Sequence, residues 1–293
     1  MNGFLVVDKV GGMTSHDVVA KIRKRFGTKK VGHAGTLDPM ATGVLVIGIG
    51  NATRLLQYVT DGSKVYQGTI RLGSATHTDD REGELISRVD SAQLSVVTNE
   101  SITAELAKMV GVIWQRPSSV SAIKIDGKAA HQRIREGESL EIPAREVRIS
   151  AITVLKIERS SEYIDIDIEV DCSAGTYIRS IARDLGDHLS VGGHLTALRR
   201  SLVSPFTLAE AKPWEIADPI DTAVGISRLF PSRTLDFNEM VEVSHGRFLT
   251  PNSTEGVVVA LTPQGAFAAL LENKDVAGTL LATPSLVVPQ SSL

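Results

Sequence analysis

The hydrophobic pattern of residues 163–172 is the sequence feature that most limits the fold. Apolar side chains stand at every second position, Ile164, Ile166, Ile168 and Val170, with an acidic residue after each of them. Successive side chains of a β-strand point to opposite faces, so this alternation predicts a strand with one buried and one polar face. We expect this strand to pair with a second strand over residues 146–158.

The acidic face of this strand could be interpreted as a metal site. Its carboxylates project in parallel along one face rather than toward one point, which favours a solvated strand face. The seven histidines lack the HxxxH and HExxH spacings of zinc hydrolases. The single cysteine, Cys172, excludes an internal disulfide and a cysteine-cluster zinc site. We therefore expect no metal.

The remaining segments predict an alternation of strands, helices and loops. Thr14 or Ser15 is expected to cap a helix over 16–26, and Thr176 a helix over 177–189. Strands are expected at 3–8, 44–49 and 63–72, a helix near 102–110, loops at 29–43 and 74–84, an exposed excursion over about 115–145, a linker at 211–228 and a small all-β domain over 229–293.

The composition is that of a soluble globular protein. Of 293 residues, 42% are hydrophobic and 22% are charged, and no apolar run approaches the roughly 20 residues that span a bilayer. Charge appears at Asp8 and Lys9, too early for a secretory signal. With one cysteine, the chain is expected in the cytoplasm, without membrane contact.

The charge is distributed unevenly along the chain. Residues 1–60 hold eight Lys/Arg and three Asp/Glu, whereas residues 211–293 hold five and nine. This asymmetry permits a basic footprint on a molecule with a net charge of −3. The basic residues of the first helix are either a polyanion site or a solvated face, and the composition does not decide between them: Lys21, Arg23, Lys24 and Arg25.

Two glycine-containing segments were compared with known site patterns. Gly48–Thr53 begins like a dinucleotide-binding loop, but Thr53 stands at the third glycine position and no acidic residue follows at the required distance, so a tight turn is favoured. The second segment places His33, Thr36, Asp38 and Thr42 within ten residues beside Lys29 and Lys30. It is either an Asp-Pro turn or a site whose carboxylate acts as base or nucleophile.

Five motifs in order resemble those of the TruB family of pseudouridine synthases, across about residues 3–205. The catalytic signature of that family resembles Gly32–Leu45, and its tyrosine motif resembles Lys64-Val65-Tyr66 with Arg71-Leu72-Gly73. Three further matches are Thr76–Gly83, Gly175-Thr176-Tyr177-Ile178-Arg179-Ser180 and Leu195–Arg200.

The resemblance implies the isomerisation of uridine 55 in the T arm of tRNA to pseudouridine, without cofactor or metal. It implies an α+β fold, with a mixed, mostly antiparallel sheet and flanking helices. The catalytic aspartate corresponds to Asp38, the base-stacking tyrosine to Tyr66 and the arginine paired with the aspartate to Arg179. Further substrate contacts are carried over to His33, Tyr177, Leu198 and Asp80.

The implied roles agree with elementary chemistry. A carboxylate can add covalently or stabilise an electron-poor sugar while the glycosidic bond is exchanged. A guanidinium close to Asp38 is expected to lower the pKa of its carboxyl group. Tyr66 would stack on the extruded uracil, and His33 would occupy the space that the base left. Without the resemblance, a core aromatic would be the favoured interpretation of Tyr66.

The family also implies how RNA is bound. The excursion over 115–145 resembles an RNA-gripping thumb containing Lys124, with Ser118 where a second proline is usual. Residues 229–293 resemble a PUA-type β-barrel. We expect the tRNA T stem-loop as partner, bound also by Lys29 and Lys30, with no DNA, no guide RNA and a monomeric chain.

Two alternatives belong to other classes. The first is an RNA-binding or tRNA-folding module whose binding matters more than its chemistry. The second is a glycoside hydrolase, which needs a second carboxylate that the loop around Asp38 does not supply.

Overall fold

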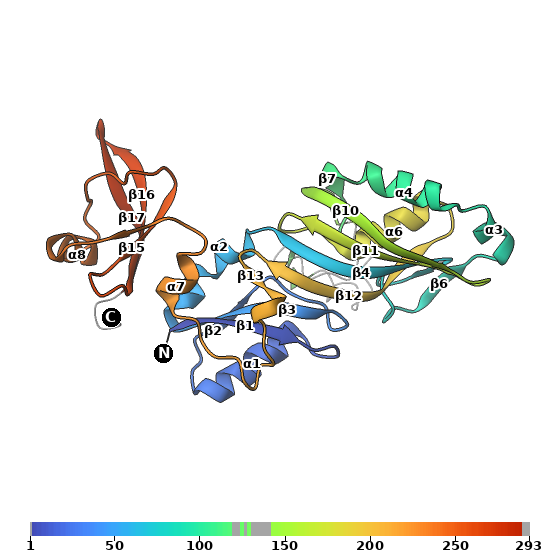
Figure 1. Ribbon diagram of the computed structural model, residues 1–293, viewed down its shortest axis with the longest axis horizontal. Helices are drawn as coiled ribbons and strands as arrows, with labels where there is room; N and C mark the ends of the chain where they lie inside the picture. The colour runs from blue at the N-terminus through green and yellow to red at the C-terminus, as the bar shows by residue number, and fades with distance from the viewer. Residues whose placement is uncertain (1, 119–123, 126–127, 130–141, 289–293) are drawn as a thin grey trace.

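A computed structural model of the chain describes residues 2–118, 124–125, 128–129 and 142–288. A large sheet with helices on its faces forms most of the molecule, and a small C-terminal sheet lies at one end, beyond helix α7 (Figure 1). The helices are α1 (Ser15–Phe26), α2 (Leu56–Thr60), α3 (Ser91–Ser95), α4 (Asn99–Lys108), α6 (Ile178–His188), α7 (Thr222–Ile226) and α8 (Phe237–Ser244).

The strands follow the chain in this order: β1 (Gly3–Lys9), β2 (Val31–Ala34), β3 (Thr42–Ile49), β4 (Lys64–Leu72), β5 (Ser74–Thr76), β6 (Leu85–Arg88), β7 (Gly111–Gln115), β8 (Lys124–Ile125), β9 (Lys128–Ala129), β10 (Arg145–Arg159), β11 (Ile164–Cys172), β12 (Gly193–Val203), β13 (Phe206–Thr207), β14 (Ser232–Thr234), β15 (Val257–Leu261), β16 (Phe267–Val276) and β17 (Thr279–Val287).

The large sheet is mixed and mostly antiparallel, as the family resemblance implied. Within the described residues it has nine strands in the order β1-β3-β12-β4-β11-β10-β7, with β2 on β3 and β13 on β12. Among the strands described for this sheet, the short contact between β12 and β3, at Arg199 and Arg200, is the one parallel pairing. This contact involves Thr42 and Gly43, the first two residues of β3. The loop before β3 therefore ends where β3 and β12 meet.

Strand β11 has the two faces that its alternation predicts. Ile164, Ile166, Ile168 and Val170 are buried in the main core. On the opposite face, Asp165 forms an ion pair with Arg71 of β4 at 2.6 Å, and Thr69 donates a hydrogen bond to Asp167 at 2.6 Å. Cross-strand pairs therefore occupy these acidic side chains.

Helix α1 begins and ends as its sequence predicts. Thr14 accepts a hydrogen bond from the Asp17 amide, and the Asp17 carboxylate accepts one from the Thr14 amide, which makes a capping box. Gly27 ends the helix with φ at 60°, a left-handed conformation that glycine adopts at little cost. The buried stripe of the helix includes Val18, Val19 and Ile22.

Four local predictions were wrong. The expected loop at 29–43 contains β2, which pairs with β3, and the expected loop at 74–84 contains β5. The C-terminal domain is not all-β, because Asp236 caps helix α8 through a capping box with Glu239. Thr176 does not cap α6, since its hydroxyl donates to the Ser173 carbonyl and Tyr177 holds the cap position.

The expected linker, 211–228, packs against the large sheet. Ile220 exchanges backbone hydrogen bonds with Phe4 at 2.8 and 2.7 Å, and Lys212 does so with Asp8 and Val6. No helix within the described residues has the length and apolar character needed to cross a bilayer.

Two cores lie on opposite faces of the sheet. The larger one joins the sheet to α1, α4 and α6. The second joins Phe4 of β1 and Val46 of β3 to Phe267 and Leu270 of the C-terminal sheet, whose strand order is β14-β15-β16-β17. The C-terminal sheet thus shares one core with β1 and β3, and it has a further core of its own that includes Val243 of α8.

Candidate active site

Asp38 lies on the loop between β2 and β3, and buried contacts fix this loop. Gly35 enters it with φ at 78°, in the region that favours glycine. The Ser15 hydroxyl donates to the Leu37 carbonyl at 3.2 Å and accepts from the Leu37 amide at 2.9 Å. The Leu37 and Met40 side chains are buried in the main core. The loop is therefore held on both sides of Asp38.

Lys9, at the end of β1, holds the other flank of this loop. Its ammonium group is buried and donates to the carbonyls of Met13 at 2.6 Å and Pro39 at 3.2 Å. Burial lowers the pKa of Lys9 to about 8, against the nearby negative charge of Asp38. The sequence analysis did not identify Lys9 as part of the site.

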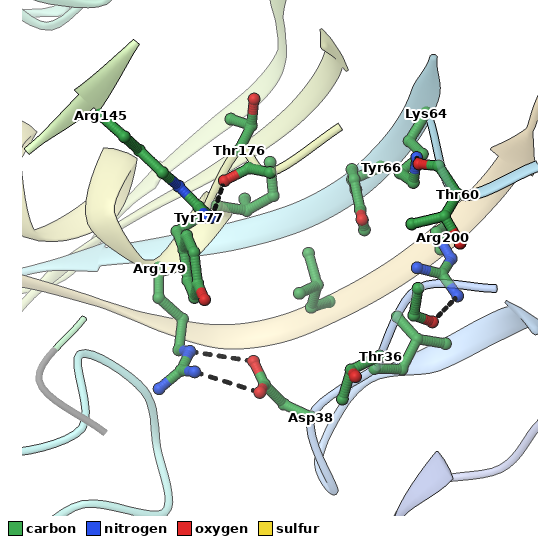
Figure 2. Close-up of a pocket in the computed structure, with 15 residues that line it drawn as sticks. Thr36, Asp38, Thr60, Lys64, Tyr66, Arg145, Thr176, Tyr177, Arg179 and Arg200 are labelled. Carbon is green, nitrogen blue, oxygen red and sulfur yellow. Dashed lines mark hydrogen bonds and ion pairs between the residues drawn. The ribbon is translucent and has the colours of Figure 1, made fainter. Parts of the chain in front are cut away.

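Arg179 grips the Asp38 carboxylate with two nitrogens. Its Nε lies 2.9 Å from Asp38 Oδ2, and its NH2 donates to Asp38 Oδ1 at 3.1 Å. Figure 2 shows these two contacts, which join Arg179, the second residue of α6, to Asp38 on the loop before β3. Such a bidentate pair fixes orientation as well as charge. The two groups are 141 residues apart in sequence, so the fold alone brings them together.

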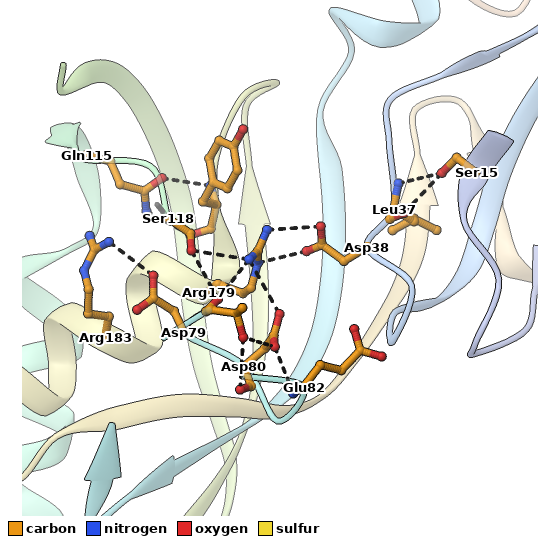
Figure 3. A network of polar contacts seen from close by, with 12 residues as sticks. Ser15, Leu37, Asp38, Asp79, Asp80, Glu82, Gln115, Ser118, Arg179 and Arg183 are labelled. Atoms are coloured by element: carbon orange, nitrogen blue, oxygen red, sulfur yellow. Dashed lines mark hydrogen bonds and ion pairs between the residues drawn. The ribbon is translucent and has the colours of Figure 1, made fainter. Parts of the chain in front are cut away.

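The third guanidinium nitrogen, NH1, is held from behind by other segments (Figure 3). It donates to the Thr78 carbonyl at 2.9 Å and the Ser118 hydroxyl at 3.3 Å, and it lies 3.5 Å from Asp80 Oδ2. The carboxylate of Asp80 in turn accepts from the Thr78 hydroxyl at 2.5 Å. Arg179 thus spans two acidic residues and has little freedom to turn.

The pKa of Asp38 moves opposite to our expectation. Burial raises the pKa of this carboxyl above its ordinary value, and the charge of Asp80 raises it further. Arg179 and Lys9 lower the pKa, as expected of cations, but they do not fully offset the loss of hydration. The site therefore holds a carboxylate that is less hydrated than a surface carboxylate.

A cavity of about 290 Å³ opens beside this pair. Asp38, Arg179, Tyr66, Tyr177 and Leu198 all line it, so the fold brings these predicted site residues to one place. Tyr66 and Leu198 are each 8% exposed, on the neighbouring strands β4 and β12. The cavity thus has aromatic and apolar side chains among the charged side chains of its lining.

Two predicted substrate contacts lie outside the lining of this cavity. Asp80 is 3% exposed, behind Arg179. His33 lies on β2 with its ring 5.4 Å from that of His16 on α1. Burial lowers the pKa of His33, and the neighbouring His16 and Arg200 lower it further.

The predicted RNA-binding residues divide into two groups. Arg25 donates to the Trp214 and Ala217 carbonyls, Arg23 donates to the Val31 carbonyl, and Lys21 lies 4.7 Å over the Trp214 ring. These side chains therefore help to hold their own chain together. Lys24, Lys29 and Lys30 are exposed and make no ion pair within the described part of the chain, whereas the side chain of Lys124 lies outside it.

Three basic residues at the cavity were missed by the sequence analysis. Arg200 is fully buried and donates to the Val44 carbonyl at 2.8 Å and the Gly35 carbonyl at 3.1 Å. Lys64 donates to the Thr60 carbonyl at 2.7 Å, and burial lowers its pKa to about 8. Arg145 lies 4.9 Å over the Tyr177 ring. Lys64 and Arg200 share a strand face with apolar residues, and this is the signal that could have identified them.

The arrangement suits a reaction on a flat ring placed beside the Asp38 carboxylate. A carboxylate, fixed by a guanidinium and poorly hydrated, can act as a nucleophile or stabilise a neighbouring cation. The surrounding cations can stabilise negative charge that develops on the ring.

Comparisons with known proteins cover both parts of the chain. Residues 23–178 match the family described as "TruB family pseudouridylate synthase (N terminal domain)". Residues 230–279 match "tRNA Pseudouridine synthase II, C terminal".

Whole-length relatives share one description. The chain is 51% identical to "tRNA pseudouridine synthase B" of Corynebacterium diphtheriae over 97% of each chain. It is 50% identical to the protein of the same description from Rhodococcus jostii, over 93% of this chain and 90% of the relative.

Solved structures share the fold at lower identity. A chain from "Structure of H/ACA RNP bound to a substrate RNA containing 2'-deoxyuridine" aligns with a TM-score of 0.71 at 23% identity, covering 98% of this chain and 86% of that one. A chain from "Crystal structure of the archaeal box H/ACA sRNP Nop10-Cbf5 complex" aligns with a TM-score of 0.69 at 23% identity, with the same coverage.

Proposed function

The chain belongs to the TruB family of tRNA pseudouridine synthases, which are isomerases, and from this we propose that it converts uridine 55 in the T arm of tRNA to pseudouridine. The observation that carries the proposal is the fixed Asp38–Arg179 pair beside a cavity walled by Tyr66 and Leu198. This cavity can hold one extruded base against the carboxylate.

The proposed reaction exchanges one bond to the sugar for another. The C1′–N1 bond breaks with its electron pair left on uracil, and the carboxylate of Asp38 takes up or stabilises the electron-poor partner. After the base turns, a C5–C1′ bond forms, the C5 proton leaves, and N1 gains a proton. No atom is added or removed overall, as an isomerisation requires.

Tyr66 supplies the flat partner for the base. Stacking on an aromatic ring contributes about 1–3 kcal/mol per base, which helps to offset the few kcal/mol needed to extrude the nucleotide. The burial of Tyr66 at the end of the cavity supports this role. His33, outside the cavity lining, is proposed to fill the position that the base has left.

Other parts of the chain are proposed to bind the rest of the tRNA. We infer that residues 229–293 form a PUA-like RNA-binding domain, that 115–145 grips the T arm, and that the chain acts as a monomer without a guide RNA. The family matches over residues 23–178 and 230–279 support the first two of these inferences.

The purified chain tests the proposal directly. Incubated with an unmodified tRNA transcript, it is expected to form one pseudouridine, at position 55 of the T arm. A transcript with cytidine at that position provides the control and is expected to remain unmodified. Pseudouridine at another position would contradict the proposed substrate, while leaving family membership intact.

The rate is expected to depend on pH through Asp38. Only the ionised carboxylate can act, and burial raises its pKa above the usual value of about 3.9. Activity should therefore fall as the pH drops through this raised pKa, so that the acid limb lies at higher pH than that of an ordinary aspartate. Single-turnover rates between pH 4 and 8 measure the limb, with the folded state followed by circular dichroism. A flat profile in that range would contradict the raised pKa.

The exposed lysines near α1 are expected to bind phosphates. Reversal of Lys24, Lys29 and Lys30 to Glu should weaken tRNA binding and reduce the salt slope by about 0.9 per lost contact. The matched control reverses Lys108, Lys156 and Arg88, which are exposed elsewhere and already paired with Glu. Binding titrations at several salt concentrations measure the salt dependence of tRNA affinity for both triple variants. An equal dependence in the two variants would indicate that Lys24, Lys29 and Lys30 are only a solvated surface.

A further inference from the structure

We propose that Gln115 and Ser118 are positioning residues for Arg179, so that the segment 115–118 sets the geometry of the reactive pair. This inference rests on the proposed function, in which Arg179 holds Asp38 for reaction. Gln115 ends strand β7, and Ser118 follows three residues later. Both side chains are buried, at 2% and 0% exposure.

Helix α6 begins without a cap of its own. Tyr177 occupies the cap position and makes no side-chain cap hydrogen bond. Four N–H groups at a helix start lack intrahelical partners, so an uncapped start depends on partners from elsewhere. Arg179 is the second residue of this helix, within the turn that lacks a cap.

Gln115 supplies the missing restraint from 62 residues away. Its amide nitrogen donates to the Tyr177 carbonyl at 3.0 Å, and its amide oxygen accepts from the Tyr177 backbone N–H at 2.8 Å. These two reciprocal hydrogen bonds fix the position and the direction of the backbone at Tyr177, where the chain enters the helix. A methionine side chain at this position, without N–H donors or an oxygen acceptor, cannot make either bond.

Ser118 holds the other end of the same arginine. Its hydroxyl accepts from Arg179 NH1 at 3.3 Å and donates to the Thr78 carbonyl at 3.1 Å, which itself accepts from NH1 (Figure 3). The Ser180 hydroxyl donates to the Arg116 carbonyl at 2.9 Å. The segment 115–118 therefore contacts the start of α6 at the Tyr177 backbone, at the Arg179 guanidinium and at Ser180, the residue after Arg179.

The distances between Arg179 and Asp38 leave little room for displacement. Arg179 meets Asp38 at 2.9 and 3.1 Å, and misplacement of a reacting group by about 1 Å can lower a rate by about 100-fold. Neither Gln115 nor Ser118 lines the cavity, so neither is expected to contact the base. Their loss should therefore lower the rate of the chemical step without changing tRNA affinity.

The test uses Gln115→Met, which keeps the length of the side chain, and Ser118→Ala, which removes one hydroxyl. Single-turnover rates with a tRNA transcript are expected to fall about 10- to 100-fold for Gln115→Met and several-fold for Ser118→Ala. The tRNA dissociation constant should stay within about 3-fold, because no phosphate contact changes. Gln67→Met is the matched control, since Gln67 is an exposed glutamine on the polar face, bonded to Glu169.

A pH profile separates positioning from a merely structural role. When Arg179 is less firmly held against Asp38, the pKa of Asp38 should rise, and the acid limb should shift to higher pH in both variants. In Gln115→Met combined with Arg179→Lys, the loss should be less than the product of the two single losses. Both results would support the proposal.

The opposite results would overturn it. These are an unchanged single-turnover rate in folded variants, an unshifted acid limb, or weaker tRNA binding that accounts for the whole loss. If Gln115→Met does not fold, Ser118→Ala carries the same test. The unchanged enzyme is assayed in parallel, so that failure of the proposed function, no pseudouridine in any variant, is distinguished from failure of this inference.

Discussion

Asp38→Asn is expected to abolish pseudouridine formation, with a loss of more than about 1,000-fold in the single-turnover rate. The amide keeps the size of the carboxylate but has neither its charge nor its nucleophilic oxygen. Tritium release from tRNA labelled at C5 of uridine measures the loss, because the C5 proton must leave when the new carbon–carbon bond forms.

The binding of tRNA separates the enzyme from a binding module. We expect the Asp38→Asn variant to bind tRNA within a few-fold of the unchanged chain, since Asp38 lies at the cavity and not among the exposed lysines. Asp171→Asn, on the polar face of β11, is the control for loss of one negative charge. Full activity of Asp38→Asn would refute the role proposed for this carboxylate.

Arg179→Lys is expected to lower the rate by about 100-fold or more, with little change in tRNA affinity. Lysine keeps the positive charge but lacks the planar fork that meets both oxygens of Asp38. It also cannot reach the Thr78 carbonyl, Ser118 and Asp80 at the same time as Asp38. The expected defect therefore comes from the loss of the two-point contact with Asp38 and not from a loss of charge.

The control for this variant lies on β4. Arg71→Lys removes the same planar fork, which at that position meets both carboxylate oxygens of Asp165 rather than those of Asp38. Rates and dissociation constants are measured for both variants. If Arg179→Lys lost affinity and rate equally, the result would indicate a phosphate contact for Arg179 in place of the one to Asp38.

Local sequence patterns predicted best those elements whose burial and ends are set by residues nearby in the sequence. The alternation in β11 and the Thr14 and Gly27 signals of α1 were sufficient. Helix α8 was missed although its Asp236-x-x-Glu239 capping box was present in the sequence. Strand β2 was missed because its four residues lie among glycines that favour a loop.

The candidate site was predictable only in part. The family resemblance named Asp38, Tyr66 and Arg179, and the cavity brings them together. Lys9 could not be identified from local sequence, because its buried charge is explained only by distant carbonyls, such as that of Pro39, which accept its hydrogen bonds. The Thr176 prediction failed for the same reason, since the restraint on α6 comes from a distant strand.

The hydrophobic interior shared by Phe4, Val46, Phe267 and Leu270 joins the two ends of the chain. Removal of the C-terminal sheet would expose the apolar side chains that it now covers on β1 and β3. The two ends are thus expected to denature in one cooperative step. A substitution that changes the size of a side chain on one side of this core is expected to require a compensating substitution on the other side. The C-terminal residues of this core, Phe267 and Leu270 among them, therefore stabilise β1 and β3 as well as their own sheet.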